Sequence, residues 1–382
     1  MKRFFVNVYA ITLALLCAAG FAVAAFFAYT GFGSSGLWLC LAGGVLSLFF
    51  APFYHETGHI VFARSKGFFV VSWKICFLKY DGADGRKKIS FCSPFAADST
   101  QAVPEQAFAD MKKRAAAYTA GGLLFGGAFL LTIIVVAAVF GGYAGAFVLF
   151  GALPYAAYLF LLNLPPFEYA GGKTDMRVLC DILKDKPYGV RLIAAMNAQG
   201  ELASGKPYSA IDKNYLENLP VIAEDEPLFA LNEFYSYYAA AELRDYEAAA
   251  KHINRIAVLS PYLTVEEQRA ALCELTYLNA LLSDETQADK CFAALSYGAE
   301  NAENAENAEN AEKSEKSVEA RSTCAENRAA AAYYVMRGDL PAAEKALSAA
   351  VKCEEQERFK GAAASERLLS EPLKERLDEL KA

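Results

Sequence analysis

The feature that most constrains this chain is an apolar run near its N-terminus, where residues 4–54 contain no charged side chain. A membrane-spanning helix needs only about 20 residues, so this run is too long for a single span. The turn-forming stretch Gly31-Phe32-Gly33-Ser34-Ser35-Gly36 divides the run. The sequence therefore predicts one membrane helix over about 6–30 and a second over about 37–64.

A cleaved signal peptide is the alternative interpretation of the first span. Lys2-Arg3, the apolar core and the small residues Ala22-Val23-Ala24 would all suit one. The apolar run continues beyond that point, which favours an anchor that is not removed.

A second run without charged side chains covers residues 115–167. The stretch Gly141-Gly142-Tyr143-Ala144-Gly145 divides it into predicted spans of about 118–140 and 145–165. The glycines of the segment 120–127 would let membrane helices approach closely. The sequence thus predicts four membrane spans in two hairpins.

The segment 66–117, between the two hairpins, is basic and rich in β-forming residues. The stretches 67–77 and 87–91 flank the turn Asp81-Gly82-Ala83-Asp84-Gly85, which predicts a β-hairpin. Basic residues in this segment and at Lys2-Arg3 predict, by the positive-inside rule, that both termini are cytoplasmic. We therefore expect a multi-pass protein of the cell membrane.

Composition separates the two halves of the chain. Hydrophobic residues make up 55% of the sequence although 21% is charged, which indicates an apolar N-terminal part and a charged C-terminal part. The net charge of −7 gives no reason to expect nucleic-acid binding. Nine cysteines are scattered without a C-x-x-C pair, and we interpret them as reduced thiols.

The second predicted span contains His55-Glu56-Thr57-Gly58-His59. Residues four apart share one face of a helix, so His55 and His59 can bind one metal ion. Glu56 lies beside them, where it can take a proton from water that the metal activates. A helix with two incidental histidines is the alternative, but the chain has only three histidines, and ionisable groups at membrane depth are usually functional.

A catalytic zinc site has three protein ligands, so one ligand is missing from this motif. The end of the fourth predicted span is expected on the same side of the membrane. Pro165-Pro166 and Gly171-Gly172 break the helix there, and the carboxylates of Glu168 and Asp175 follow the span. Both are candidate third ligands.

The H-E-x-x-H motif in one span, followed by a span that ends in Asn163-Leu164-Pro165 and by Thr174-Asp175, resembles the site-2 protease family of intramembrane zinc metalloproteases. The resemblance covers about residues 37–180. Met176 stands where the family usually has glycine, and Pro165-Pro166 departs from its usual proline spacing, so Glu168 stays an alternative. The resemblance implies zinc ligands His55, His59 and Asp175, a general base Glu56, and Asn163 beside the substrate.

Residues 181–382 have helical spacing, and we expect them to form a cytoplasmic domain. The segments 234–261 and 329–353 resemble tetratricopeptide helix pairs, and 267–295 is a poorer copy. A generic α-helical domain is the alternative. Repeats of this kind bind protein segments, so a cytoplasmic protein partner is expected. Residues 299–317, which begin with four Ala-Glu-Asn copies, predict a linker, and we assign His252 no special role.

These observations predict an all-α membrane protein with four transmembrane helices and an intervening β-hairpin, followed by an α-helical repeat domain. The two predicted domains are residues 1–180 and 181–382. The expected function is zinc-dependent cleavage of a membrane protein in or near its transmembrane segment. The alternative is a catalytically silent membrane adaptor with a structural or vestigial zinc site.

Overall fold

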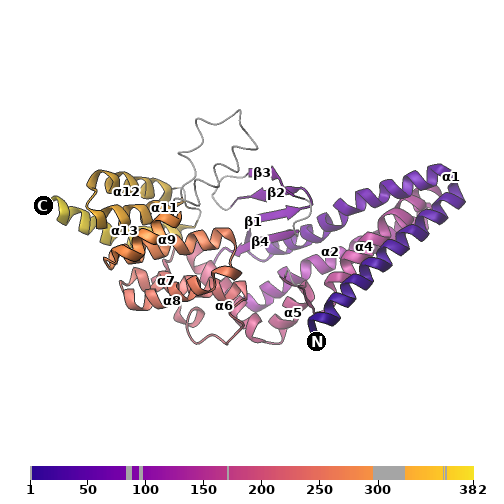
Figure 1. The fold of residues 1–382 in the computed structure, drawn as a ribbon. Helices are drawn as coiled ribbons and strands as arrows, with labels where there is room; N and C mark the ends of the chain where they lie inside the picture. Colours follow the sequence, from indigo (N-terminus) through magenta and orange to yellow (C-terminus); the bar gives the residue numbers. More distant parts are fainter. Residues whose placement is uncertain are drawn as a thin grey trace, which may run out of the picture. The chain divides into compact units, whose positions relative to one another are not determined.

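The structure of the protein is a computed structural model, and helices predominate in it (Figure 1). The chain forms two compact units, Met1–Met196 and Asn197–Ala382. The structure describes residues 2–82, 88–93, 98–169, 172–295, 323–355, 357 and 359–382. The predicted linker 299–317, residues 83–87 at the predicted β-turn, and Gly171 of the predicted helix break lie outside the described residues.

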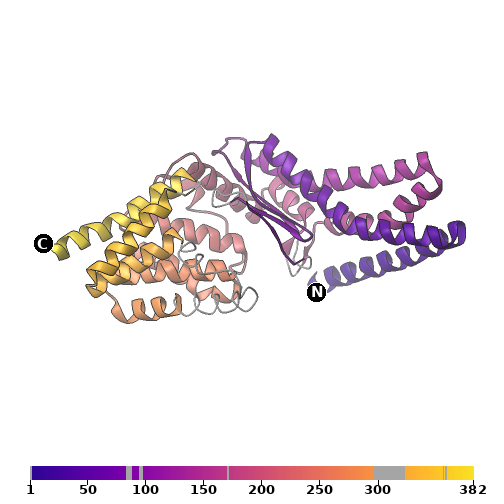
Figure 2. The same cartoon turned by 90° about the horizontal axis from the view of Figure 1, so that it is seen from above.

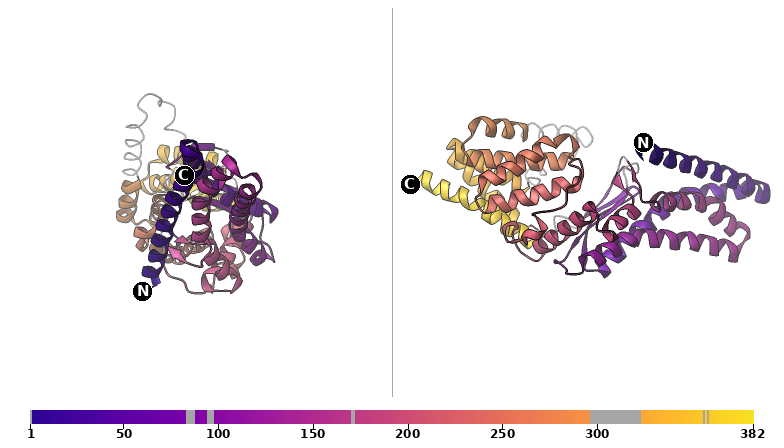
Figure 3. Two further views of the ribbon diagram at one scale, coloured as in Figure 1. Left: turned by 90° about the vertical axis from the view of Figure 1, so that its right-hand side faces the viewer. Right: turned by 90° about the horizontal axis from the view of Figure 1, so that it is seen from below.

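The long helix α1, Lys2–Ser65, turns back on itself at Gly33. Gly33 has φ 66° and ψ −155°, which are not helical values and which suit a residue without a side chain. The two limbs of α1 then run beside each other, as Figure 3 shows for the indigo and purple segments. A methyl group on Gly44 would come within 2.6 Å of the Phe21 ring, so the limbs are in direct contact.

The other apolar helices of the first unit follow the sheet. Helix α2, Met111–Phe140, is followed by the short α3, Gly142–Gly145, the π-helix η1, Ala146–Ala152, and α4, Leu153–Asn163. Within the described residues, three helical segments are long and apolar enough to cross a membrane, and they are Phe5–Ser65, Met111–Phe140 and Gly142–Asn163. The first of them contains both predicted spans, 6–30 and 37–64. The chain thus has the helices of a membrane protein.

A four-stranded antiparallel sheet lies between α1 and α2 in the chain (Figure 2). Its order is β3-β2-β1-β4, so β3 and β4 are the edge strands. The strands are β1, Phe68–Ile75; β2, Leu78–Asp81; β3, Lys88–Phe91; and β4, Ser99–Pro104.

The predicted pairing of 67–77 with 87–91 is wrong, because the chain reverses earlier than expected. Cys76 adopts φ 53°, which permits a tight turn in which Ile75 pairs with Leu78. Strand β2 pairs with β3 instead, and β1 lies between β2 and β4. The stacked rings of Trp73 and Tyr80, 5.8 Å apart, stabilise the β1–β2 pair.

The first unit continues past the predicted boundary at 180. After the ribbon of β5, Glu168–Tyr169, and β6, Gly172–Lys173, come α5, Asp175–Leu183, and α6, Pro187–Ala203. Ile182 and Met196 are buried in one cluster with Phe68 and Ala115, which extends the unit to residue 196.

The second unit consists of helix pairs, and the turn between the two helices follows the same pattern in three of the pairs. Each turn has a residue with positive φ followed by an aspartate whose carboxylate caps the next helix. The positive-φ residues are Arg244, Ser283 and Gly338, and the capping residues are Asp245, Asp284 and Asp339. The helices are α7, Pro227–Glu242; α8, Tyr246–Val258; α9, Val265–Leu281; 285–295; α11, Cys324–Arg337; α12, Leu340–Glu354; and α13, Lys360–Lys381.

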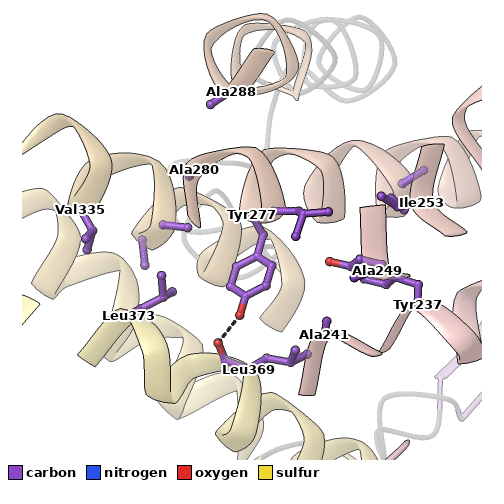
Figure 4. Close-up of a cluster of buried hydrophobic side chains, with 14 of the residues drawn as sticks. Tyr237, Ala241, Ala249, Ile253, Tyr277, Ala280, Ala288, Val335, Leu369 and Leu373 are labelled. Carbon is purple, nitrogen blue, oxygen red and sulfur yellow. Dashed lines mark hydrogen bonds between the residues drawn. The ribbon is translucent and has the colours of Figure 1, made fainter. Parts of the chain in front are cut away.

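Alanines, aliphatic residues and tyrosines fill the core of the second unit (Figure 4). Tyr277 is fully buried, and its hydroxyl donates a hydrogen bond of 2.7 Å to the Leu369 carbonyl. This bond joins α9 to α13. The regions predicted from the sequence as helix pairs are therefore helical and share a core.

Candidate metal centre

His55, Glu56 and His59 lie on the second limb of α1, on the turns that follow Pro52. Their exposed fractions are 7%, 5% and 7%. The two imidazole rings are 5.1 Å apart, as expected for residues four apart on one helical face. Three ionisable side chains are therefore buried together inside an apolar helix, which is costly without a functional role.

Asp175 is distant from the histidines in the sequence, and the chain brings it close to them by turning at Thr174. The Thr174 hydroxyl donates to the Pro165 carbonyl at 2.7 Å and accepts from the Arg177 amide at 3.2 Å. Thr174 thereby caps α5 and closes the loop that follows α4. Asp175 is the first residue of α5, and its carboxylate lies against α1.

Three ligand atoms converge at this point. Asp175 Oδ2 lies 2.9 Å from His55 Nε2 and 3.3 Å from His59 Nε2. One potential ligand atom from each residue lies within 4.8 Å of the other two. Two imidazole nitrogens and one carboxylate oxygen form a donor set that zinc binds.

The carboxylate of Asp175 lacks the hydrogen bond that a buried oxygen normally has. Oδ2 is shielded from solvent and receives no hydrogen bond from the described residues. A buried carboxylate oxygen that has no hydrogen bond and lies between two imidazoles suits a bound cation.

The protonation of His59 points to the same conclusion. Its Nδ1 lies 3.0 Å from the Tyr118 carbonyl oxygen, which can only accept, so Nδ1 carries a proton. The other ring nitrogen, Nε2, faces Asp175 Oδ2 at 3.3 Å and is the atom that would bind a cation. Backbone contacts of this kind commonly orient metal-binding histidines.

Two glycines of α2 make room for the cluster. A methyl group on Gly121 would come within 2.5 Å of the Gly58 carbonyl oxygen, so the backbones of α1 and α2 touch there. A methyl group on Gly122 would lie 2.3 Å from His59 Nε2 and 2.8 Å from His55 Nε2. Gly122 therefore keeps open the space in front of both ligand nitrogens. The glycine pair was visible in the sequence, but it predicted only close helix packing.

Glu56 contacts the sheet. Its Oε2 accepts a hydrogen bond of 2.6 Å from the Thr100 hydroxyl of β4. The Tyr118 hydroxyl donates at 2.6 Å to the Thr100 carbonyl. Sequence reasoning missed Thr100 and Tyr118, because nothing in the local sequence shows that either residue approaches the motif.

The other predicted site residues lie elsewhere. Glu168 is 45% exposed, and its carboxylate is 3.9 Å from Lys173 Nζ, in the β5–β6 ribbon. The Asn163 amide donates to the Leu159 carbonyl of its own helix at 3.3 Å, so its role beside the substrate stays a prediction. His252 pairs with Glu233 at 2.8 Å in the second unit. The structure thus brings together His55, His59 and Asp175, with Glu56 adjacent.

Comparisons with protein-family models, with curated proteins and with solved structures found no match to this chain. We therefore infer a function from the geometry of the cluster.

Proposed function

We propose that the protein is an intramembrane zinc endopeptidase of the site-2 protease type, which hydrolyses a peptide bond in or near a transmembrane segment of a membrane protein. The single observation that carries the proposal is the convergence of His55, His59 and the unbonded Asp175 Oδ2, with the Glu56 carboxylate one residue from a ligand. The resemblance of the motifs to that family supports the same assignment.

Each residue has a distinct role in this proposal. His55, His59 and Asp175 hold the zinc ion, which when bound would supply Lewis acidity to the attacking water and the scissile carbonyl. Glu56 takes the proton from the water and returns it to the leaving amine. Because Glu56 is buried, its carboxylate can act without competition from bulk solvent.

The substrate must present an extended segment, because a helix hides its carbonyl groups in internal hydrogen bonds. Strand β4 is an edge of the sheet and carries Thr100 beside Glu56. An extended substrate segment that pairs with an edge of this sheet would be near the site, and such strand addition is a common mode of peptide binding. The substrate-binding role predicted for Asn163 belongs to the same proposal.

The proposed topology has four membrane crossings. The two limbs of α1 provide the first two, and α2 and the segment Gly142–Asn163 provide the others. Both termini are then cytoplasmic, and the second unit is a tetratricopeptide-like domain that binds a cytoplasmic protein partner. A silent adaptor is the competing proposal, but a structural zinc site has no need of a buried carboxylate beside its ligands.

The substitution Glu56→Gln tests the proposal. The full-length protein is reconstituted in vesicles with a pool of single-span peptides tagged at both ends, and cleavage and zinc content are measured. We expect Glu56→Gln to slow cleavage by about 100-fold or more, which is the usual worth of a general base, and to keep its zinc. Glu105→Gln, which changes an exposed carboxylate of the same unit, is the control. Cleavage by Glu56→Gln at the parent rate would contradict the proposal.

A further inference from the structure

The hydrogen bond between Thr100 and Glu56 connects the sheet to the proposed general base. Thr100 Oγ1 lies 2.6 Å from Glu56 Oε2, and the Glu56 side chain is buried. A carboxylate can accept hydrogen bonds at both oxygens, and Thr100 donates to Oε2. In the proposed reaction the other oxygen, Oε1, would exchange the proton with water.

We propose that Thr100 is a positioning residue, which holds the Glu56 carboxylate in the orientation that proton transfer requires. This inference rests on the proposed function of Glu56 as general base. The terminal torsion of a glutamate is broad and weakly restrained, so the carboxylate needs an external contact to fix its plane. A shift of about 1 Å in a reacting group can cost on the order of 100-fold in rate.

Thr100 is itself held firmly enough to serve this purpose. It lies in β4 opposite Trp73 of β1, so the sheet fixes its backbone. The Tyr118 hydroxyl donates to the Thr100 carbonyl at 2.6 Å, and the Tyr118 carbonyl accepts from His59 Nδ1 at 3.0 Å. A closed series of contacts therefore runs from Glu56 through Thr100 and Tyr118 to His59. Thr100 thus contacts the base, Tyr118 contacts a candidate zinc ligand, and Thr100 and Tyr118 are hydrogen-bonded to each other.

If Thr100 only filled space, its substitution would have different consequences than if its hydroxyl orients the Glu56 carboxylate. Valine has nearly the shape of threonine and suits a strand, but it has no donor. Serine keeps the donor and lacks the methyl group. Thr100→Val and Thr100→Ser thus separate the hydrogen bond from the packing.

The first measurement is cleavage of the tagged peptide pool by the full-length protein in vesicles. We expect Thr100→Val to lower kcat by about tenfold or more, the worth of one hydrogen bond to a charged group, with KM and zinc content unchanged. Thr100→Ser should restore most of kcat. Ser72→Ala, which removes a hydroxyl bonded to Gln101 in the same sheet, is the matched control and should keep the parent rate. An unchanged kcat in Thr100→Val, or a loss that serine does not rescue, overturns the inference.

The second measurement does not depend on activity. Thr100→Val is made in the parent and in Glu56→Ala, and Tm is measured for all four proteins. We expect a loss of about 2–4 °C in the parent background, and a clearly smaller loss where the Glu56 carboxylate is absent. Equal losses in the two backgrounds show that the hydroxyl does not act through Glu56 and overturn the inference. A parent that cleaves no peptide while Tm shows the coupling would contradict the proposed function, and with it the positioning role, but not the contact.

Discussion

Both units bury charged side chains, but the partners that surround these side chains differ. In the second unit Arg328 has no exposed surface, and it pairs with Glu274 at 2.8 Å and with Glu366 at 2.8 Å. The hydroxyls of Tyr237 and Tyr238 donate to the Glu274 carboxylate as well. In the first unit Asp175 Oδ2 is shielded from solvent, faces two imidazole nitrogens and receives no hydrogen bond within the described residues.

The difference separates a cluster that is complete within the chain from one that we propose binds a metal ion. Buried charges whose partners all come from the chain are complete, so the Arg328 cluster needs no ligand to be stable. In the Asp175 cluster, two imidazole nitrogens and a shielded carboxylate oxygen face one another, an arrangement that a bound cation would complete. A buried polar atom without a hydrogen bond is the kind of exception that calls for a functional explanation.

The largest effect is expected from a substitution that disrupts the Arg328 cluster. Arg328→Met leaves the fully buried Glu274 without its counter-charge, and we expect a loss of about 3–5 kcal/mol in the free energy of unfolding of the second unit. Chemical denaturation followed by circular dichroism measures it. Arg337→Met is the control on the same helix, because Arg337 forms ion pairs at the surface, and it should change stability much less. Zinc affinity should stay the same in both variants, and equal stabilities of the two variants would contradict the comparison.

The next effect concerns the third ligand. Asp175→Ala should weaken zinc binding by more than about 100-fold, because even residues that only orient metal ligands are worth about 10- to 100-fold. Glu168→Ala removes an exposed carboxylate of the same segment and should leave zinc affinity unchanged. Zinc titration of the purified, chelator-treated proteins measures both. The reverse result would mean that the chain binds zinc through Glu168.

A smaller effect is expected from filling the space in front of the His55 and His59 imidazole nitrogens. Gly122→Ala would place a methyl group 2.3 Å from His59 Nε2, so the imidazoles must move and zinc affinity should fall by about 10- to 100-fold. Gly127→Ala adds the same methyl group to the same helix at an ordinary 3.4 Å from the Phe160 ring, and its affinity should equal that of the parent. Equal affinities for the two variants would show that the ligand atoms do not face α2.

The sequence predicted most of the helices and part of the cluster. His55 and His59 share a helical face because of their spacing, and the runs without charged residues predicted the apolar helices. The sequence left Asp175 and Glu168 as candidates for the third metal ligand. Only the fold shows that Asp175 lies against the histidines. The sheet was predicted in part, because the early turn at Cys76 and the strand β4 gave no clear local signal.

The amino-acid sequence by itself determined the features that depend on neighbours along the chain. These are the apolar helices, the paired histidines with Glu56, and the helix pairs of the second unit, since helical periodicity and turn chemistry act over a few residues. The tertiary structure decided which distant residues meet. Thr100, Tyr118, Gly122 and Asp175 reach the cluster from a strand and two helices. Such contacts depend on strand register and helix packing, which no short stretch of sequence specifies.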